Sequence, residues 1–303
     1  DTPCYVMRPA DDELLTLTLA GQYCYVFTPP QMGKSSLAIR AASLLRDQGQ
    51  AAAIIYASGL GTNISPELWY LGLAMRLATQ LKVDVDVEAW WEEQAALPAG
   101  QRFTDFLRHV VLSEITEPVV IFVDELESLL ELNFLEAFLA LIRSAYDARS
   151  TDSVYNRLTF ALFGRVAPAD LSQDHSRSPL TVAERVELND FSREEATVLF
   201  QGLKRVLPDQ AETIFARVFQ WTNGHPYLTQ KLCLQVVQAK DRRWTEDREE
   251  EWVDRLAERT FLLSSAGEEP VLEFARSRLE HSPRRRRLIG LYRQIYTGKD
   301  MAD

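Results

Sequence analysis

The sequence is poor in cysteine, in long apolar runs and in positive charge. Its three cysteines, Cys4, Cys24 and Cys233, lie far apart and show neither metal-ligand nor redox spacing, so reduced, buried thiols are expected. No stretch approaches the roughly 18 uninterrupted apolar residues that a membrane span needs, and no signal peptide opens the chain. These absences predict a cytoplasmic protein with no membrane partner.

Positive charge is scarce as well, because 33 Lys and Arg stand against 44 Asp and Glu. The resulting net charge of −11 and pI near 5.0 argue against a non-specific nucleic-acid binder, which normally presents a basic balance. At 303 residues the chain is long enough for two or three domains. It begins at Asp1 and not at methionine, so we expect it to be a piece of a longer protein.

The stretch 23–37 has the pattern of a phosphate-binding loop, since an apolar run stops at two prolines and an amphipathic helix follows. The amides of Met32 to Ser36 would point at a β-phosphate, helped by the positive end of the new helix. Lys34 would bridge the β- and γ-phosphates, Ser35 would ligate Mg²⁺, and Gly33 would let the backbone approach the phosphate.

One position departs from the pattern G-x-x-x-x-G-K-[ST], because Thr28 stands where the first glycine belongs. The motif is therefore carried by its second half. The competing interpretation is a Gly-Lys-Ser sequence in an ordinary turn before a helix.

The segment 118–125 contains the second motif of the sequence. Five consecutive apolar residues, 119–123, indicate a strand buried on both faces, and the strand ends in two carboxylates. Asp124 would hold Mg²⁺ through water and Glu125 would polarise an attacking water. The separation of about ninety residues from Ser35 suits an ATPase with a strand inserted between the two motif strands. If the acids only capped the next helix, that role would suit Glu127 better than Asp124.

Three arginines are further candidates. Arg8 lies in an extended lead-in that could pack on the adenine, although a solvated arginine is the simpler account. Arg165 follows a predicted strand at 158–163, and ligands of open α/β sheets bind beyond that edge, so it is placed to sense a γ-phosphate. Arg149 could act in trans on a neighbour's nucleotide. The alternative for Arg165 and Arg149 is an ordinary surface arginine, since such residues are common.

Strands are also predicted at 52–57 and 184–188, whereas helices take over from Ser192 onward. Pro226 opens one of these helices after a glycine corner, where it could lie against the base or ribose or form an ordinary helix-helix turn. The run 284–287 consists of four arginines, which on a helix point in directions about 100° apart and so indicate a solvated helix start, with DNA contact as the minority interpretation.

The motifs of this chain together resemble the bacterial AAA-like domain of large multidomain proteins, within the class of signal-transduction ATPases with numerous domains (STAND). The resemblance implies an α/β fold: a five-stranded parallel P-loop sheet of the ASCE type with helices on both faces, then an all-α lid and a partial winged-helix region. The implied domains are 1–190, 191–240 and 241–303. The resemblance rests on the following motifs: Tyr5-Val6-x-Arg8, Gly21-x-x-Cys24-Tyr25-Val26, Gln31-Met32-Gly33-Lys34-Ser35-Ser36-Leu37, Trp69-Tyr70, Trp90-Trp91, Ile121-Phe122-x-Asp124-Glu125, 157–162, Trp221-Thr222-x-Gly224-x-Pro226 and 228–233.

By this resemblance the protein is an ATP/ADP-binding switch with slow Mg²⁺-dependent hydrolysis, which self-associates in the ATP state and controls a fused effector or sensor. The chain departs from the family pattern at two positions. Where the family commonly has an arginine this chain has Pro30, and where the family commonly has an apolar residue it has Arg165. The alternatives are a nucleotide-binding scaffold without turnover and a DNA-linked helper ATPase. The expected site is Glu125, Lys34 and Arg165 for catalysis, Arg8, Gln31, Met32, Gly33, Lys34, Ser35, Ser36 and Pro226 for the nucleotide, and Ser35 and Asp124 for the metal.

Overall fold

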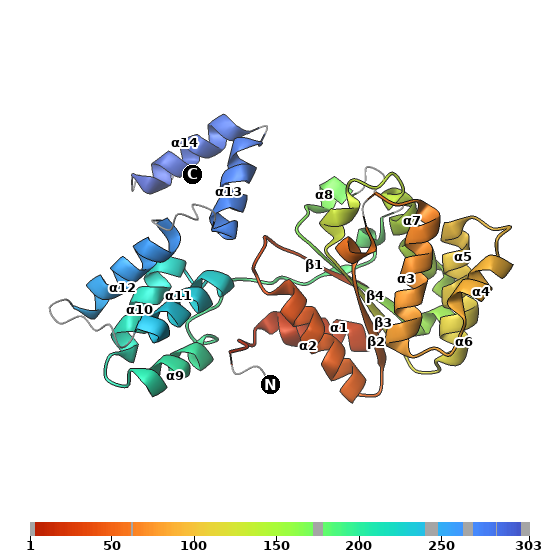
Figure 1. Cartoon of the computed structure of the whole chain (residues 1–303), viewed down its shortest axis with the longest axis horizontal. Coiled ribbons are helices and arrows are strands. Elements are labelled where there is room, and N and C mark those ends of the chain that lie inside the picture. The colour runs from red at the N-terminus through yellow and green to blue at the C-terminus, as the bar shows by residue number, and fades with distance from the viewer. Residues whose placement is uncertain are drawn as a thin grey trace. The chain divides into compact units, whose positions relative to one another are not determined.

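The computed structural model describes residues 4–61, 63–171, 178–239, 248–262, 269–282 and 284–297. The chain forms two compact units (Figure 1). One unit is Val6–Asp190, and the other is Phe191–Asp303 together with Asp1–Tyr5. We call the first the sheet unit and the second the helical unit, and describe each by itself.

The sheet unit is built on five parallel strands. They are β1 (Cys24–Phe27), β2 (Ala51–Tyr56), β3 (Val119–Asp124), β4 (Leu158–Gly164) and β5 (Glu184–Arg185). Their order is β2-β3-β4-β1-β5, and every neighbouring pair is parallel. β4 therefore lies between β1 and β3. The predicted five-stranded parallel sheet is confirmed, including the strand inserted between the two that carry the motifs.

Helices cover both faces of this sheet (Figure 1). Every residue of β3 is therefore buried, and its side chains alternate between two cores. Val120 and Phe122 pack toward α1 (Pro9–Leu19) and α2 (Lys34–Asp47). The odd-numbered residues of β3 pack toward the other core, which contains α3 (Pro66–Leu81), α5 (Ala99–Phe106) and α7 (Leu135–Asp147).

The aromatic residues of the segment 59–115 belong to this second core. Trp69 is 1% exposed, and its ring centroid lies 5.0 Å from that of Phe138. The remaining elements of the unit are α4 (Val87–Glu93), η2 (Leu107–Val111), α6 (Leu112–Glu114), α8 (Pro168–Leu171) and the 3₁₀ turns η1 (Ala57–Leu60), η3 (Leu126–Leu129), η4 (Ala148–Ser150), η5 (Ser153–Arg157) and η7 (Pro179–Thr181).

In the described parts of the helical unit all regular elements are helices. They are α9 (Thr197–Val206), α10 (Ala211–Thr222), α11 (Pro226–Ala239), α12 (Glu249–Ala257), η8 (Glu258–Leu262), α13 (Pro270–Glu280) and α14 (Arg285–Tyr296). The guanidinium of Arg217 donates to both carboxylate oxygens of Asp254, at 2.6 and 2.7 Å, and thereby ties α10 to α12. No helix in the described residues is long and apolar enough to cross a membrane.

The cysteines are all free, but they are not all buried. Burial raises the pKa of the Cys24 and Cys233 thiols to about 12, so both stay protonated at neutral pH. Cys4, in the segment ahead of the first helix, is exposed. The expectation of three buried thiols is therefore wrong at Cys4.

Candidate functional site

The loop between β1 and α2 turns tightly. Gln31 and Gly33 both adopt left-handed conformations, with φ of 65° and 89°. A Cβ at Gly33 would lie 3.0 Å from an Arg8 guanidinium nitrogen, a tight contact, and its positive φ is one that L side chains rarely adopt, so glycine is favoured here. α2 then begins at Lys34, and its glycine N-cap offers the first amides no side-chain acceptor.

Lys34 reaches back over this loop. Its Nζ donates to the carbonyl oxygens of Pro29 at 2.7 Å and Thr28 at 2.9 Å. The side chain is buried, and this burial lowers the pKa of Lys34 to about 8, against the opposing effect of nearby Glu127 and Asp124. The ammonium is thus a desolvated cation held at the mouth of the loop.

The two predicted motifs meet at one hydrogen bond. Ser35, in the first turn of α2, donates from Oγ to Asp124 Oδ2 at 2.6 Å, across 89 residues of sequence. Asp124 is 2% exposed, and burial raises the pKa of its carboxyl, although the bonds from Ser35 and from the amide of Glu125 oppose that shift. The sequence therefore placed the end of β3 correctly beside the start of α2.

Glu125 follows β3 in a left-handed conformation, with φ of 63°. Its carboxylate accepts a hydrogen bond from the hydroxyl of Ser58, just after β2. Sequence reasoning missed Ser58. The signal that could have found it is topological, because β2 and β3 are parallel neighbours with Tyr56 paired to Asp124, so the residues after both strands share one edge.

Arg165 lies at the same edge, after β4, and it is paired. Its Nε donates to Glu127 Oε1 at 2.6 Å and its amide to Oε2 at 2.9 Å. Burial opposes ionisation of Glu127, but the hydrogen bonds from Arg165 outweigh it and lower the pKa of this carboxyl. Glu127 is therefore an anchor for Arg165.

Arg149 lies elsewhere. Its guanidinium packs 4.7 Å from the ring centroid of Tyr23 and donates to the carbonyl of Leu158, the first residue of β4. In a parallel sheet the start of β4 belongs to the edge opposite the site. The possibility that Arg149 acts on a neighbour's nucleotide loses support, because its charge is engaged in holding the fold.

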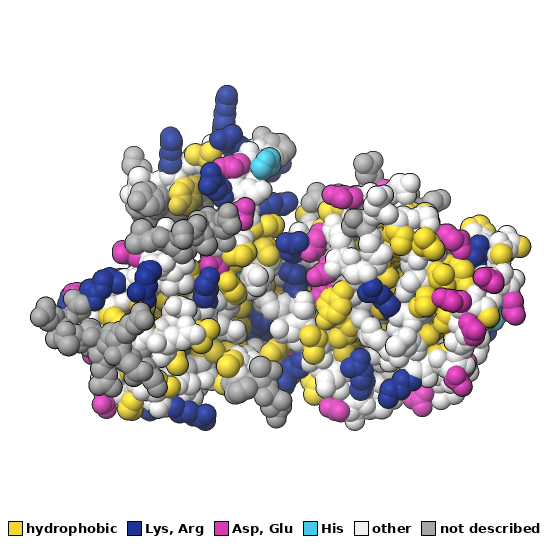
Figure 2. Space-filling model, viewed as in Figure 1, with side chains coloured by type: hydrophobic (Ala, Val, Ile, Leu, Met, Phe, Trp, Pro, Cys, Tyr) yellow, Lys and Arg dark blue, Asp and Glu magenta, His cyan; other side chains and the backbone are white. Residues whose placement is uncertain are grey.

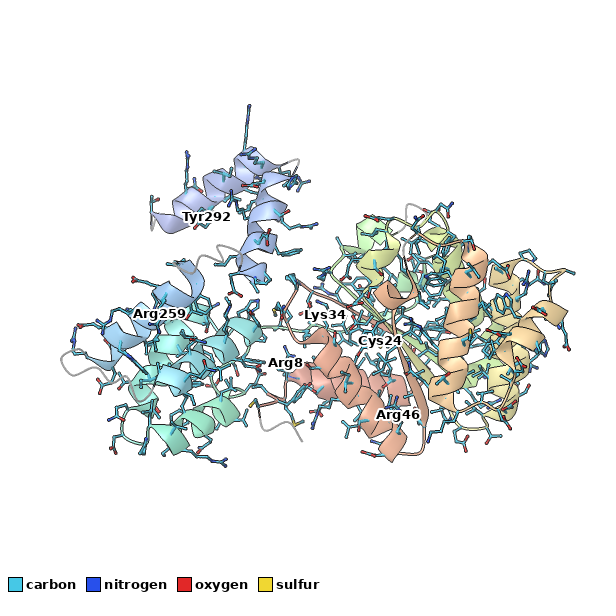
Figure 3. The ribbon with its side chains drawn as sticks, in the orientation of Figure 1. Arg8, Cys24, Lys34, Arg46, Arg259 and Tyr292 are labelled. Atoms are coloured by element: carbon cyan, nitrogen blue, oxygen red, sulfur yellow. The ribbon has the colours of Figure 1, made fainter. Side chains whose placement is uncertain are left out.

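Arg8 is buried, which contradicts the solvated alternative. Its Nη1 donates to the carbonyls of Met32, in the loop, and Asn189, near the end of the sheet unit, at 2.9 and 3.2 Å. Figure 3 shows Arg8 and Lys34 at the end of α2 where the helix begins.

The other predicted contacts fall in two places. Met32 is buried in the loop, whereas Gln31 and Ser36 are exposed. Pro226 is buried at the first position of α11 and belongs to the helical unit.

The charges at the loop fit a magnesium polyphosphate. A buried ammonium and a buried carboxylate both have pKa values displaced against their charged forms, so each gains from a counter-charge. A phosphate would supply that charge to Lys34 and a divalent cation would supply it to Asp124. Ser35, whose hydroxyl lies against Asp124, would be a second oxygen ligand for such a cation.

The comparison with protein families agrees with this geometry, since a family model described as an AAA-like domain matches residues 1–247. The chain belongs to the AAA-like domain family. This AAA-like chain is also 38% identical, over 241 residues, to an uncharacterised WD repeat-containing protein of Synechocystis sp.. The match covers 78% of the chain and only 20% of that protein.

Two solved structures of the ORC2 protein of Aeropyrum pernix share the fold. The ADP form has a TM-score of 0.54 at 15% identity, and the match covers 84% of the AAA-like chain and 68% of that chain. The structure with ADPNP and ADP complexes has a TM-score of 0.52 at 13% identity, and covers 82% and 65%. At such identities the likeness concerns the fold alone.

Proposed function

We propose that the chain is an ATP/ADP-binding switch module of a larger bacterial signalling or defence protein, with slow Mg²⁺-dependent hydrolysis. The observation that carries this proposal is the 2.6 Å hydrogen bond from Ser35 to Asp124, because it joins the loop and the acidic strand end beside the buried ammonium of Lys34. Membership of the AAA-like domain family supports nucleotide binding. The ORC2 structures of similar fold were solved with ADP and with ADPNP, which agrees with nucleotide binding.

In this proposal each residue has a distinct task. The amides of Met32 to Ser36 and the ammonium of Lys34 bind the phosphates, while Gly33 lets the backbone approach. Ser35 and Asp124 hold Mg²⁺, which supplies charge neutralisation at the phosphates. Glu125 orients water at the same edge.

The remaining proposed contacts surround this centre. Arg165 contributes a positive charge near the γ-phosphate, and Glu127 holds it there. Gln31 and Ser36 line the loop. Arg8 supports the loop through its hydrogen bond to the carbonyl of Met32. The contact of Pro226 with the base or ribose stays a prediction from the sequence.

The switch role, the STAND class and self-association in the ATP state belong to this proposal. The match covers 20% of the Synechocystis protein, and this supports a module within a longer protein. We propose that ADP holds a monomer and that exchange for ATP allows assembly, which activates a fused effector. Light scattering on the ADP-bound and ATP-bound protein tests this directly, since an unchanged mass would remove assembly from the proposal.

Calorimetry tests nucleotide binding. Lys34→Ala should abolish ADP binding, because it removes the buried cation of the loop. The matched control is Lys204→Ala, which removes an exposed lysine of α9 in the helical unit and should leave the affinity unchanged. If Lys34→Ala binds ADP as the wild type does, the loop is not the nucleotide site.

A scaffold that binds nucleotide without turnover is a second candidate. The contact between Ser58 and Glu125 favours it, because it engages the carboxylate that would orient water. Glu125→Gln distinguishes the two. If the purified wild type carries ADP and the variant carries ATP, the protein hydrolyses ATP, whereas an unchanged nucleotide favours the scaffold.

One feature favours the alternative of a DNA-linked helper ATPase: all four residues of the run 284–287 are exposed at the start of α14. Acidic side chains gather elsewhere on the surface, over the α3–α5 side of the sheet unit (Figure 2), where Asp84, Asp86, Glu88, Glu92 and Glu93 are exposed. Duplex binding with a salt dependence that falls when the arginine run is neutralised would favour this alternative.

A further inference from the structure

Arg8 connects two parts of the chain that lie far apart in sequence. One nitrogen, Nη1, donates to the carbonyl of Met32 in the phosphate loop and to the carbonyl of Asn189. Asn189 lies two residues before Phe191, with which the helical unit resumes. A single buried guanidinium therefore touches both the loop and the segment that leads into the other unit.

The far end of this segment is clamped as well. The amide of Phe191 donates to the carbonyl of Gly224 at 2.9 Å. A Cβ at Gly224 would lie 2.1 Å from the carbonyl oxygen of Phe191, so the contact depends on glycine. We call residues Asn189–Phe191 the linker: Arg8 holds one end within the sheet unit, and Gly224 holds the other within the helical unit.

The contact at Met32 also orients a phosphate-binding group. In a planar trans peptide the C=O of Met32 and the N–H of Gly33 point in opposite directions. Because the carbonyl of Met32 faces Arg8, the amide of Gly33 points away from it. A phosphate bound to that amide would polarise the peptide and make the carbonyl of Met32 a stronger acceptor for Arg8.

We infer that Arg8 is a positioning residue that couples occupancy of the phosphate loop to the linker. The inference rests on the nucleotide binding proposed above. Bound polyphosphate strengthens the contact between Met32 and Arg8, and this fixes the guanidinium that also holds Asn189. The linker is then more tightly held when the loop is full. An arginine suits this task, because its planar fork stays charged and presents several donors in fixed directions.

Hydrogen exchange followed by mass spectrometry tests the coupling, with peptides that cover the loop (28–36) and the linker (187–192). With saturating ADP the wild type should show protection of the loop, and exchange at the linker should slow about twofold, because polarisation adds only a fraction of the net free energy of one charged hydrogen bond. In Arg8→Gln, at ADP concentrations that still protect the loop, the linker rate should not respond to ADP. The response to ADP is the readout, since a purely structural role of Arg8 would alter only the rate without nucleotide.

Arg46→Gln is the matched control. Arg46 also donates to a main-chain carbonyl, that of Ala52, at 3.2 and 2.8 Å, but it lies at the other end of α2 (Figure 3). This variant should keep the wild-type linker response. If Arg8→Gln does not fold, Arg8→Lys takes its place, because it retains the charge without the planar fork and should lose the response as well.

The outcomes separate the two proposals. If ADP protects the loop but the linker of Arg8→Gln still responds as in the wild type, the coupling through Arg8 is refuted and nucleotide binding stands. The same holds if the wild-type linker never responds. If ADP fails to protect the loop of the wild type, the proposed function is refuted and the coupling with it.

Discussion

Lys34 should lower the folding stability of the nucleotide-free protein, although nucleotide binding requires it. Burial lowers the pKa of its ammonium from 10.5 to about 8, which corresponds to roughly 3 kcal/mol of unfavourable free energy when the folded protein holds the charge at neutral pH. Lys34→Met removes that cost. It also removes two hydrogen bonds to loop carbonyls, worth about 1 kcal/mol each, so the variant should be more stable than the wild type by about 1 kcal/mol at pH 7.

The dependence on pH identifies the cause. Below pH 8 both the folded and the unfolded wild type hold the proton, and the folded state bears the full cost. Between pH 8 and about 10.5 the folded protein has lost the proton while the unfolded chain still binds it, so the stability of the wild type rises with pH relative to the variant. The difference in unfolding free energy between the two proteins should change by about 2.5 kcal/mol from pH 7 to pH 10.

Urea unfolding at the two pH values is the assay. Tryptophan fluorescence reports the sheet unit through the buried Trp69 and Trp91, and the transition of the helical unit is fitted separately. Other titrating groups are common to both proteins and cancel in the difference. With ADP at about 100 times its dissociation constant, the wild type should gain about 2.7 kcal/mol and Lys34→Met should gain nothing. A difference that stays constant within about 0.5 kcal/mol between pH 7 and pH 10 would refute the reasoning.

Three further predictions concern other parts of the molecule. Of the three cysteines only Cys4 should react with a chromogenic disulfide reagent in the folded protein, whereas all three should react in urea; two or three fast thiols would contradict the burial found here. Gly224→Ala should cost roughly 2–4 kcal/mol in the urea transition of the helical unit, because its methyl group would collide with the carbonyl of Phe191; an unchanged midpoint would show that the corner relaxes freely. Ser58→Ala should raise the steady-state rate of ATP hydrolysis severalfold, since it releases the carboxylate of Glu125, and a lower rate would show that Ser58 assists the reaction.

The sequence was informative where local pattern and topology determine position. The run 119–123 has no polar residue, so its strand had to lie inside a sheet, and parallel strands bring their carboxyl ends to one edge. That reasoning was enough to bring Asp124 to Ser35. It was also enough to place Arg165 at the same edge.

The sequence could not determine which partners the polar side chains would choose. The contacts of Arg8 with Met32 and of Ser58 with Glu125 join segments far apart in the chain, and no spacing rule reports them. Arg149 shows the same difficulty, because the aromatic ring of Tyr23 that receives it is 126 residues away and reads as an ordinary core residue. The exposure of Cys4 depends likewise on tertiary packing.

The central claim is that one loop and one acidic strand end hold a magnesium polyphosphate together. A crystal structure of the protein with ADP and Mn²⁺, with anomalous data collected for manganese, tests it most directly. The account predicts phosphates against the amides of 33–35 and an anomalous peak at about 2.1 Å from Ser35 Oγ, on the side of Asp124. Nucleotide or metal bound at another place, or none at all at saturating concentration, would contradict it.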